Sequence, residues 1–267
     1  MFSCIRLLGL GVKMAWVDSH CHLDFPEFND LDNMLQQLKA KGCERILLPG
    51  TEAEFFARQQ AVQARDKTFI WCAYGLHPYF LSEHAEAHLQ ILDTTLNQQP
   101  CKAVGEIGLD FMLPADTHDK QTALFAQQVS MAKAHKLPLV LHCRKAHDQL
   151  ASYLKRQQFS HGGFVHGFSG SMQQAKRYLD LGFVLGLGGA LTYDRAKALK
   201  NLVKNLPSTA YVLETDSPDM RPAFARDQPN TPLNVPKIAE HIAQIRGQSL
   251  EAVYTESSAN FYAVLTP

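Results

Sequence analysis

The sequence predicts an α/β protein whose strands close into a TIM (β/α)8 barrel. The chain of 267 residues is 46% hydrophobic, so it holds enough apolar material for one large core. Eight short apolar runs alternate with segments of helical periodicity, which implies parallel strands joined by helical crossovers. Eight is also the number of strands that closes a barrel, and barrels of roughly 250 residues are common.

The predicted strands are short runs of β-forming residues that recur along the sequence. In chain order they are AWVDSH, RILLPG, FIWCAYGLH, KAVGEIG, LPLVLHC, GGFVHGF, FVLGLGG and YVLETDS. Between the first two, apolar residues stand at helical spacing before Gly42, which marks a helix end; they are Leu31, Met34, Leu35 and Leu38. The further predicted helices span residues 52–66, 83–98, 117–136, 145–159, 171–181, 195–205, 235–246 and 250–265.

An open, doubly wound sheet is the alternative arrangement of the same elements. Such a sheet normally carries a glycine-rich phosphate-binding turn after its first strand. Here the residues SHCHLD occupy that position, so the barrel is favoured. No stretch is of low complexity or rich enough in Pro and Ser to act as a linker, and we expect a single domain over residues 14–267.

Residues 1–13 form a separate segment, because Met14 stands directly before the first predicted strand. The apolar stretch from Leu7 to Val12 is short and broken by glycines, so it suits neither a signal peptide nor a membrane span. We expect residues 1–13 to be a disordered extension or a start-site artefact. A cleaved export signal is the minor alternative.

Charge and cysteine content restrict the class of protein. The 26 basic and 26 acidic residues cancel, whereas a protein that coats long nucleic acids usually shows a basic excess. An enzyme that binds a few phosphates locally is still compatible with this balance. The six cysteines form no CxxC pair and lie in apolar runs, which is typical of reduced cysteines in a cytoplasmic protein. The sequence indicates no membrane segment and no obligate protein partner.

Polar residues follow five of the predicted strands, at the end where barrel enzymes place their active sites. His20 and His22 follow the first strand and point to the same face if the chain is extended there. The others follow four later strands: Glu106, His142, His166 and Asp216. Taken singly, each has an ordinary structural explanation, such as a hydrogen-bonded core histidine, a buried ion pair or a helix cap.

Together, these six residues predict a metal site. Four histidines and two carboxylates on one face of a barrel would be sterically and electrostatically unfavourable without cations among them. Imidazole and carboxylate groups suit Zn²⁺, Mn²⁺ and related ions, and two ions bridged by one carboxylate would use the whole set.

Five segments together resemble the TatD family of metal-dependent hydrolases: DSHCHLD, GEIGLD, LVLHCR, VHGFSG and LETDSP. They occur in the family's order, the resemblance runs from about Val17 to the C-terminus, and it is greatest to the YjjV-type subgroup. It implies a TIM barrel of the metal-dependent amidohydrolase type and, as in many members, deoxyribonuclease activity. Gly167 stands where many relatives have cysteine, which leaves the adjacent His166 unchanged. Residues 1–13 lie outside the resemblance.

The resemblance also implies how two divalent cations would be held. One ion would be bound by His20, His22 and Asp216. Glu106 would bridge to a second ion, which His142 and His166 would also bind. Zn²⁺ and Mn²⁺ suit these ligands, and loosely bound Mg²⁺ is the alternative. Glu106 and Asp216 are the expected catalytic residues, with Asp216 as the general base that takes a proton from the metal-activated water.

Three further residues are candidate substrate contacts. Arg144 shares the strand-end face of His142, and its guanidinium group fits a pair of phosphate oxygens, although a surface salt bridge is equally compatible. His77 ends the third strand and faces the same mouth, unless it only forms the turn before Pro78. Tyr193 is placed to stack on a nucleobase or to pack under its own loop.

The favoured function is a TatD-like deoxyribonuclease that cleaves phosphodiester bonds at DNA ends or in short single-stranded DNA. A neutral net charge suits contact with a strand end better than tracking along a duplex. The alternative is a dinuclear hydrolase of a small-molecule ester, lactone or amide, because substrate loops rather than the fold decide specificity. A cyclic-amide hydrolase would carry a lysine where Glu106 stands. Metal storage or an adaptor role is disfavoured, because storage needs no open coordination position beside Arg144.

Overall fold

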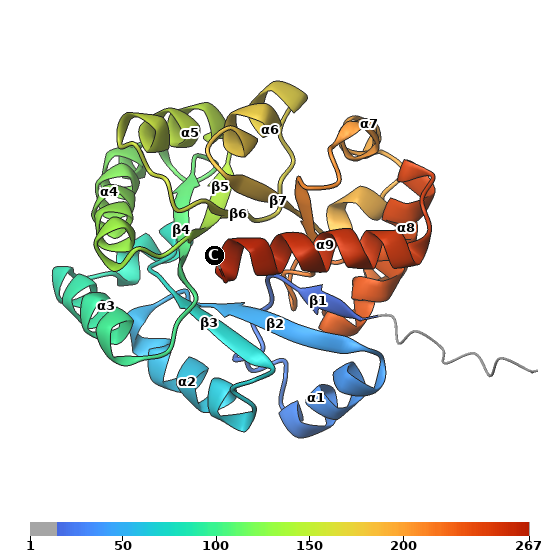
Figure 1. The fold of residues 1–267 in the computed structure, drawn as a ribbon. Helices are drawn as coiled ribbons and strands as arrows, with labels where there is room; N and C mark the ends of the chain where they lie inside the picture. The colour runs from blue at the N-terminus through green and yellow to red at the C-terminus, as the bar shows by residue number, and fades with distance from the viewer. Residues whose placement is uncertain (1–14, 267) are drawn as a thin grey trace, which may run out of the picture.

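A computed structural model describes residues 15–266, whose strands form one eight-stranded parallel sheet in sequence order (Figure 1). The strands are β1 (Trp16–Asp18), β2 (Cys43–Pro49), β3 (Ile70–Tyr74), β4 (Ala103–Asp110), β5 (Leu139–Arg144), β6 (Gly163–Val165), β7 (Phe183–Leu187) and β8 (Tyr211–Leu213). Each of the eight predicted strands is present. The extension predicted over residues 1–13 lies outside the described residues and stays a prediction.

The barrel is closed by contacts just beyond the ends of β1 and β8. Asp216 N donates a hydrogen bond to His20 O at 2.8 Å. Cys21 and Ser217 form a parallel β-bridge at the same seam. The predicted TIM barrel is therefore confirmed, and the seam joins two of the segments that carry candidate metal ligands.

Helices alternate with the strands, and all of those described except the last pack around the outside of the barrel (Figure 1). They are α1 (Leu31–Ala40), α2 (Phe56–Arg65), α3 (Glu86–Gln98), α4 (His118–His135), α5 (His147–Arg156), α6 (Met172–Leu179), α7 (Lys197–Asn205), α8 (Val235–Arg246) and α9 (Leu250–Leu265). The bounds of α8 and α9 match the prediction. The helix predicted over residues 52–66 opens instead with a 3-10 turn, η1 (Ala53–Phe55), because such tight turns are frequent at helix N-termini.

Local sequence signals explain where several helices begin and end. At the start of α6, Ser171 Oγ accepts a hydrogen bond from Gln174 N at 3.2 Å, and Gln174 Oε1 accepts one from Ser171 N at 2.9 Å. This reciprocal capping box satisfies two backbone donors that the first turn of a helix leaves free. Gly247 ends α8 with φ of 65°, a left-handed conformation that costs glycine little.

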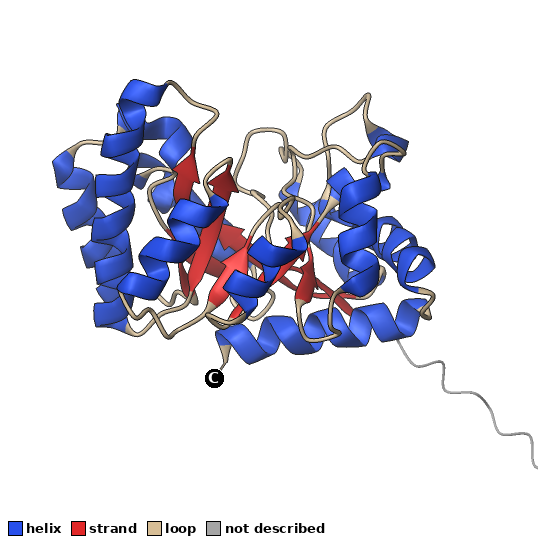
Figure 2. Ribbon diagram, turned by 90° about the horizontal axis from the view of Figure 1, so that it is seen from above, coloured by secondary structure: helices blue, strands red, loops and turns tan. Residues whose placement is uncertain are grey.

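The C-terminal helix α9 lies across the end of the barrel at which the strands begin, and the longer loops gather at the other end (Figure 2). Phe261 of α9 is fully buried, and its ring centroid lies 5.7 Å from that of Trp71 and 5.8 Å from that of Phe164. One apolar residue from each strand packs in the same cluster: Val17, Leu47, Ala73, Ala103, Val140, Phe164, Val184 and Val212. Helix α9 therefore closes the barrel core at the end where the strands begin.

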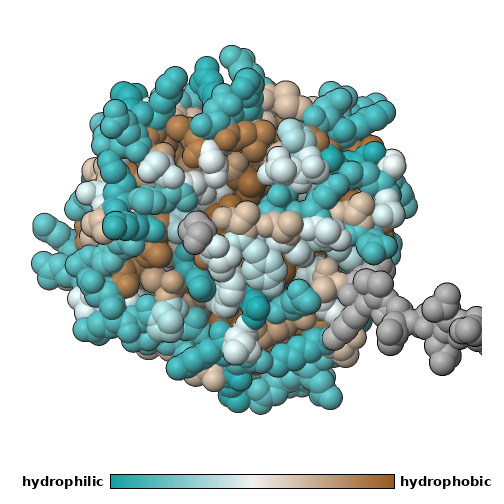
Figure 3. All heavy atoms as spheres, viewed as in Figure 1, coloured by the Kyte–Doolittle hydropathy of each residue, from teal (hydrophilic) through white to brown (hydrophobic). Residues whose placement is uncertain are grey.

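On this sealed face, hydrophilic side chains cover much of the outer helices, and an apolar strip shows between α9 and helices α5 and α6 (Figure 3). Within residues 15–266, no helix combines the length and the apolar character that a membrane crossing requires. The polar residues singled out in the sequence lie at the opposite end of the barrel.

Truncating Phe261 tests how much the packing of α9 against the barrel contributes to stability. Phe261→Ala is expected to lower the free energy of unfolding by about 3–5 kcal/mol, because it removes a buried ring and leaves a cavity. The measurement is urea unfolding followed by circular dichroism. Ile91→Ala, at a side chain 45% exposed on α3, is the control and should change the stability by less than about 0.5 kcal/mol. Equal stability of the two variants would show that α9 does not stabilise the barrel.

Candidate metal centre

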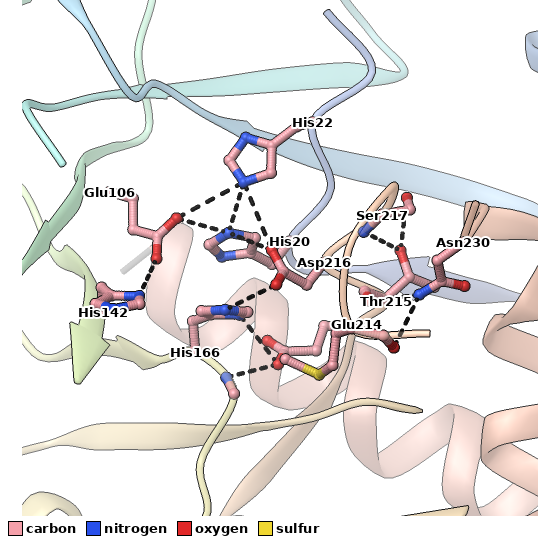
Figure 4. A network of polar contacts seen from close by, with 12 residues as sticks. His20, His22, Glu106, His142, His166, Glu214, Thr215, Asp216, Ser217 and Asn230 are labelled. Atoms are coloured by element: carbon pink, nitrogen blue, oxygen red, sulfur yellow. Dashed lines mark hydrogen bonds and ion pairs between the residues drawn. The ribbon is translucent and has the colours of Figure 1, made fainter. Parts of the chain in front are cut away.

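The six predicted ligands converge at the end of the barrel opposite α9 (Figure 4). The side chains of His20 and Glu106 are almost completely buried, and those of His22 and His166 are only slightly exposed. A cavity of about 610 Å³ opens onto this cluster, and its wall includes five of the six: His22, Glu106, His142, His166 and Asp216. The arrangement combines a buried set of donor atoms with access from solvent.

Glu106 occupies the centre of the cluster. Its Oε2 lies 3.0 Å from His20 Nε2 and 3.7 Å from His22 Nε2. Its Oε1 lies 3.1 Å from His142 Nδ1 on the other side. The two oxygens of one carboxylate therefore face two separate sets of imidazoles, as the bridging role predicted for Glu106 requires.

Asp216 closes the cluster from the β8 side. Its Oδ1 lies 3.5 Å from His20 Nε2 and 3.6 Å from His22 Nε2, and its Oδ2 lies 3.4 Å from His166 Nε2. The backbone of Asp216 has φ of 55°, a left-handed conformation that few residues other than glycine adopt and that aspartate tolerates. This turn directs the carboxylate across the seam toward His20 and His22, which follow β1.

The donor atoms fall into three overlapping groups, each with all of its atoms within 4.8 Å of one another. The groups are His20, His22, Asp216; His20, Glu106, His166; and His77, Glu106, His142. The first is the set predicted for one ion. The second predicted set is divided between the other two groups, and the ring centroids of His142 and His166 lie 6.4 Å apart.

His77 belongs to the third group by position, but its hydrogen bonds make it a donor. Tyr79 N donates to His77 Nδ1 at 3.1 Å, so the neutral ring carries its proton on Nε2. That nitrogen lies 3.1 Å from Glu106 Oε1. Burial is the main reason that the pKa of His77 falls to about 4, so the ring is neutral at pH 7. We conclude that His77 orients the Glu106 carboxylate by a hydrogen bond.

The donor set fits a divalent cation. His20 Nε2 and His22 Nε2 face each other at 3.3 Å, with oxygens of Glu106 and Asp216 within 4 Å of both. Buried lone pairs that converge in this way are well satisfied by a shared cation. Imidazole nitrogen and carboxylate oxygen are ligands that Zn²⁺ and Mn²⁺ accept.

Two further carboxylates, which the sequence reasoning did not single out, contact the histidines from behind. Asp110 Oδ2 lies 3.1 Å from His142 Nε2, and Glu214 Oε1 lies 3.1 Å from His166 Nδ1. Glu214 also accepts a hydrogen bond from Gly167 N at 2.7 Å. Outer carboxylates of this kind fix the orientation and the tautomer of a ligand histidine. Strand periodicity was the available signal, since Glu214 precedes Asp216 by two residues and Asp110 follows Glu106 by four.

Gly186 gives Glu214 the space it occupies. A Cβ atom at Gly186 would overlap with Glu214 Oε2, so Gly186→Ala must displace the carboxylate from His166. We expect the affinity for a divalent cation, measured by isothermal titration calorimetry, to fall about 10- to 100-fold, as for other losses of an outer partner. Val184→Ala, on the same strand at the α9 end, is the control: it should lower stability and leave metal affinity unchanged. Unaltered affinity in Gly186→Ala would contradict a role for Glu214.

Burial and the charges of neighbouring side chains set the protonation states of the metal-free cluster. Burial opposes the charge on His166, but the carboxylates of Asp216, Glu214 and Glu106 outweigh it and raise the pKa of His166 well above its usual range. Burial would raise the pKa of Glu106, yet the charges of the surrounding histidines hold it well below its ordinary value. At neutral pH the metal-free site therefore pairs a protonated His166 with ionised carboxylates.

This protonation predicts how metal binding depends on pH. A cation can use His166 only after its proton leaves, so metal affinity should rise as pH increases toward the raised pKa of His166, and fall as pH decreases. Calorimetric titration with Mn²⁺ or Zn²⁺ in buffers of different ionisation enthalpy will report protons released per ion. We expect net proton release near neutral pH. Affinity that stays constant across the pH range, with no proton released, would contradict this prediction.

The predicted substrate contacts have different placements. Arg144 lines the cavity with its side chain 56% exposed, and its Nη1 lies 3.6 Å from Asp110 Oδ2. Tyr193 is not among the described residues that line this cavity. Its hydroxyl donates to Arg221 O at 3.0 Å, and the guanidinium of Arg195 lies 4.9 Å from its ring centroid. Stacking of a nucleobase on Tyr193 gains no support from this placement and stays a prediction.

Comparison with known proteins places this geometry in a family. The sequence model of the family described as "TatD related DNase" matches residues 17–266. The Escherichia coli K12 protein described as "Uncharacterized metal-dependent hydrolase YjjV" is 38% identical over 252 residues, covering 93% of this chain and 97% of that protein. Its crystal structure superimposes with a TM-score of 0.91 at 37% identity, covering 96% of this chain and 99% of that one.

One further relative and one structural neighbour show the range of the family and of the fold. The Klebsiella pneumoniae protein described as "3'-5' ssDNA/RNA exonuclease TatD" is 30% identical over 237 residues, covering 86% of this chain and 90% of that protein. N-isopropylammelide isopropylaminohydrolase from Burkholderia multivorans shares only the fold, with a TM-score of 0.59 at 13% identity over 94% of this chain and 74% of that one. The chain therefore belongs to the TatD family of metal-dependent hydrolases, within its YjjV subgroup.

Proposed function

We propose that this protein is a deoxyribonuclease that uses two divalent cations to hydrolyse phosphodiester bonds at the ends of single-stranded DNA. The position of Glu106 carries the proposal, because its two oxygens face separate sets of imidazoles beneath an open cavity. The relative named as a 3'-5' single-stranded DNA and RNA exonuclease supports a nucleic-acid substrate. Arg144 on the cavity wall supports one that carries phosphate.

The residues around the cavity hold the cations, accept a proton or position the phosphate. The cations would be held by His20, His22, Glu106, His142, His166 and Asp216. When bound, divalent cations supply a water that is nucleophilic at neutral pH and offset the charge that develops on the phosphoryl oxygens. Asp216, whose carboxylate faces His20, His22 and His166, accepts the proton of the attacking water. The exposed guanidinium of Arg144 positions the phosphate by paired hydrogen bonds.

Net charge favours an end-cleaving enzyme over one that tracks along a duplex. The 26 basic and 26 acidic residues leave no bulk attraction for a long polyanion, so binding depends on local contacts at the cavity. We place this activity in the cytoplasm, as the scattered cysteines of the sequence predict.

The test uses protein stripped of metal and reloaded separately with Mg²⁺, Mn²⁺ and Zn²⁺. Each form is offered an end-labelled single-stranded oligonucleotide and a panel of esters, lactones and amides, with Asp216→Asn as the blank. Stepwise shortening of the oligonucleotide, absent from the blank, is the expected result and identifies the active metal. Turnover confined to the panel would overturn the nuclease proposal and assign the same centre to a small-molecule ester, lactone or amide.

A further inference from the structure

Tyr79 is an exposed aromatic residue at the mouth of the metal centre. Among the described residues, the large apolar side chains that stay exposed are Tyr79, Ile91, Met112 and Met172. Tyr79 is the most exposed of them, at 60%, and it lines the cavity that opens onto Glu106 and Asp216. A ring left in water forgoes the gain from burial, and at this position its face is accessible to a molecule that enters the cavity.

The segment that carries Tyr79 is tied to the centre through its backbone. It begins the 3-10 turn η2 (Pro78–Glu83), in which Pro78 is buried and has its φ restricted by the pyrrolidine ring. Tyr79 N donates to His77 Nδ1, and His77 Nε2 lies 3.1 Å from Glu106 Oε1. The turn that carries the Tyr79 ring is therefore hydrogen-bonded to His77, and His77 in turn contacts the Glu106 carboxylate.

The side chains around Tyr79 add aromatic surface and one positive charge. Phe25 and Phe80 line the same cavity, and the ring centroid of Phe80 lies 5.2 Å from that of Tyr79 in an edge-on arrangement. Arg144 lines the same cavity and supplies a permanent positive charge. Aromatic rings that stack on bases, together with a cation that binds phosphate, make up the composition of sites for single-stranded nucleic acid.

We propose that Tyr79 is a substrate-binding residue whose ring stacks on an unpaired nucleobase of the strand end held at the metal centre. This inference rests on the proposed nuclease function and names the residue that selects an unpaired end. An internal base of a duplex is stacked on both faces and a terminal one is held by its pairing, so an unpaired base is the one free to turn onto the Tyr79 ring. The stacking role expected of Tyr193 passes to Tyr79, since Tyr193 is engaged with Arg221 and Arg195 outside this cavity wall.

The experiment combines removal of the Tyr79 ring with removal of the bases at the end of the substrate. The substrates are an end-labelled oligonucleotide and versions whose two nucleotides at either the 3' or the 5' end are abasic. The enzymes are wild type, Tyr79→Ala, Tyr79→Phe and Ile91→Ala, each loaded with the active metal. Because Tyr79→Ala keeps the backbone N–H that contacts His77, its effect reports the ring.

We expect Tyr79→Ala to lower kcat/KM on the intact oligonucleotide by about 5- to 150-fold, mainly through KM. Tyr79→Phe keeps a stacking face and should stay close to wild type, as should Ile91→Ala, which removes an exposed apolar side chain on α3. On the substrate that lacks the stacked bases, the penalty for Tyr79→Ala should be much smaller. An equal penalty on intact and abasic substrates, or none on either, would overturn the stacking role.

The same data separate this inference from the proposed function. Hydrolysis of the intact oligonucleotide by the wild-type protein tests the nuclease activity, whatever Tyr79 does. Its absence would overturn the nuclease proposal and the stacking role together. Hydrolysis by the wild type with no dependence on the pairing of ring and base would overturn the stacking role alone.

Discussion

Glu106→Gln is expected to abolish hydrolysis, with a fall in kcat of at least about 10³-fold. The amide keeps the size of the side chain but removes the negative charge that faces His20 on one side and His142 on the other. Both sets of donors lose their shared anionic ligand. The variant should therefore also bind less metal than the wild type, which distinguishes it from a change that impairs chemistry alone.

The measurement combines metal content by inductively coupled plasma mass spectrometry with turnover of whichever substrate the wild type accepts. Glu256→Gln is the matched control, because that carboxylate lies on α9 at the sealed end, where it accepts a hydrogen bond from Tyr211 Oη at 2.7 Å. It should retain metal and activity. Circular dichroism establishes that Glu106→Gln is folded. Wild-type turnover in a folded Glu106→Gln protein would remove Glu106 from the centre.

The fold could be predicted well because the barrel repeats one simple pattern. Each strand is buried on both sides, so it reads as a continuous apolar run, and each helix shows one apolar face. Turns were harder to predict. No element was predicted between the third strand and the helix over residues 83–98, but residues 78–83 form the 3-10 turn η2, and α3 begins only at Glu86. Short turns depend on a few backbone hydrogen bonds that leave no period in the sequence.

The candidate site could be predicted in part, by the rule that alternate residues of a strand share a face. That rule selected His20 with His22 and, applied to the last strand, would also have selected Glu214 with Asp216. It cannot tell which carboxylate meets the cation and which supports a histidine, because that depends on side-chain direction. The assignment of His77 as a hydrogen-bond donor needed the backbone N–H of Tyr79, which only the folded turn brings to its ring.

The loops carry aromatic residues whose positions the sequence left open or did not address. Tyr79 and Tyr193 both follow strand ends, and nothing in their local sequence distinguishes a ring that lines the cavity from one that rests against a neighbouring loop. In the structure, Tyr79 lies on the cavity wall, whereas the Tyr193 hydroxyl donates a hydrogen bond to Arg221 O. Contacts between loops far apart in the chain decide this difference, and they are set by the closed barrel beneath them.

Asp216→Asn is expected to lower kcat by about 10²- to 10⁴-fold, the range for losing a general base. Burial would raise the pKa of Asp216, but the charges and hydrogen bonds of His166 and His22 hold it well below its ordinary value. The wild-type side chain is therefore ionised at every working pH, whereas the amide can take no proton. Asparagine adopts the left-handed backbone of this position as readily as aspartate, so the turn with φ of 55° should survive.

Metal content separates the two roles assigned to Asp216. Its carboxylate lies at one edge of the cluster, 3.5 Å from His20 Nε2 and 3.4 Å from His166 Nε2, whereas Glu106 lies between the two sets of donors. Asp216→Asn should therefore keep more metal than Glu106→Gln while losing comparable activity. Asp227→Asn, at a carboxylate 93% exposed in the same loop, should behave as wild type. If Asp216→Asn lost activity only in proportion to its lost metal, Asp216 would be a ligand alone, and the proton would pass to another group.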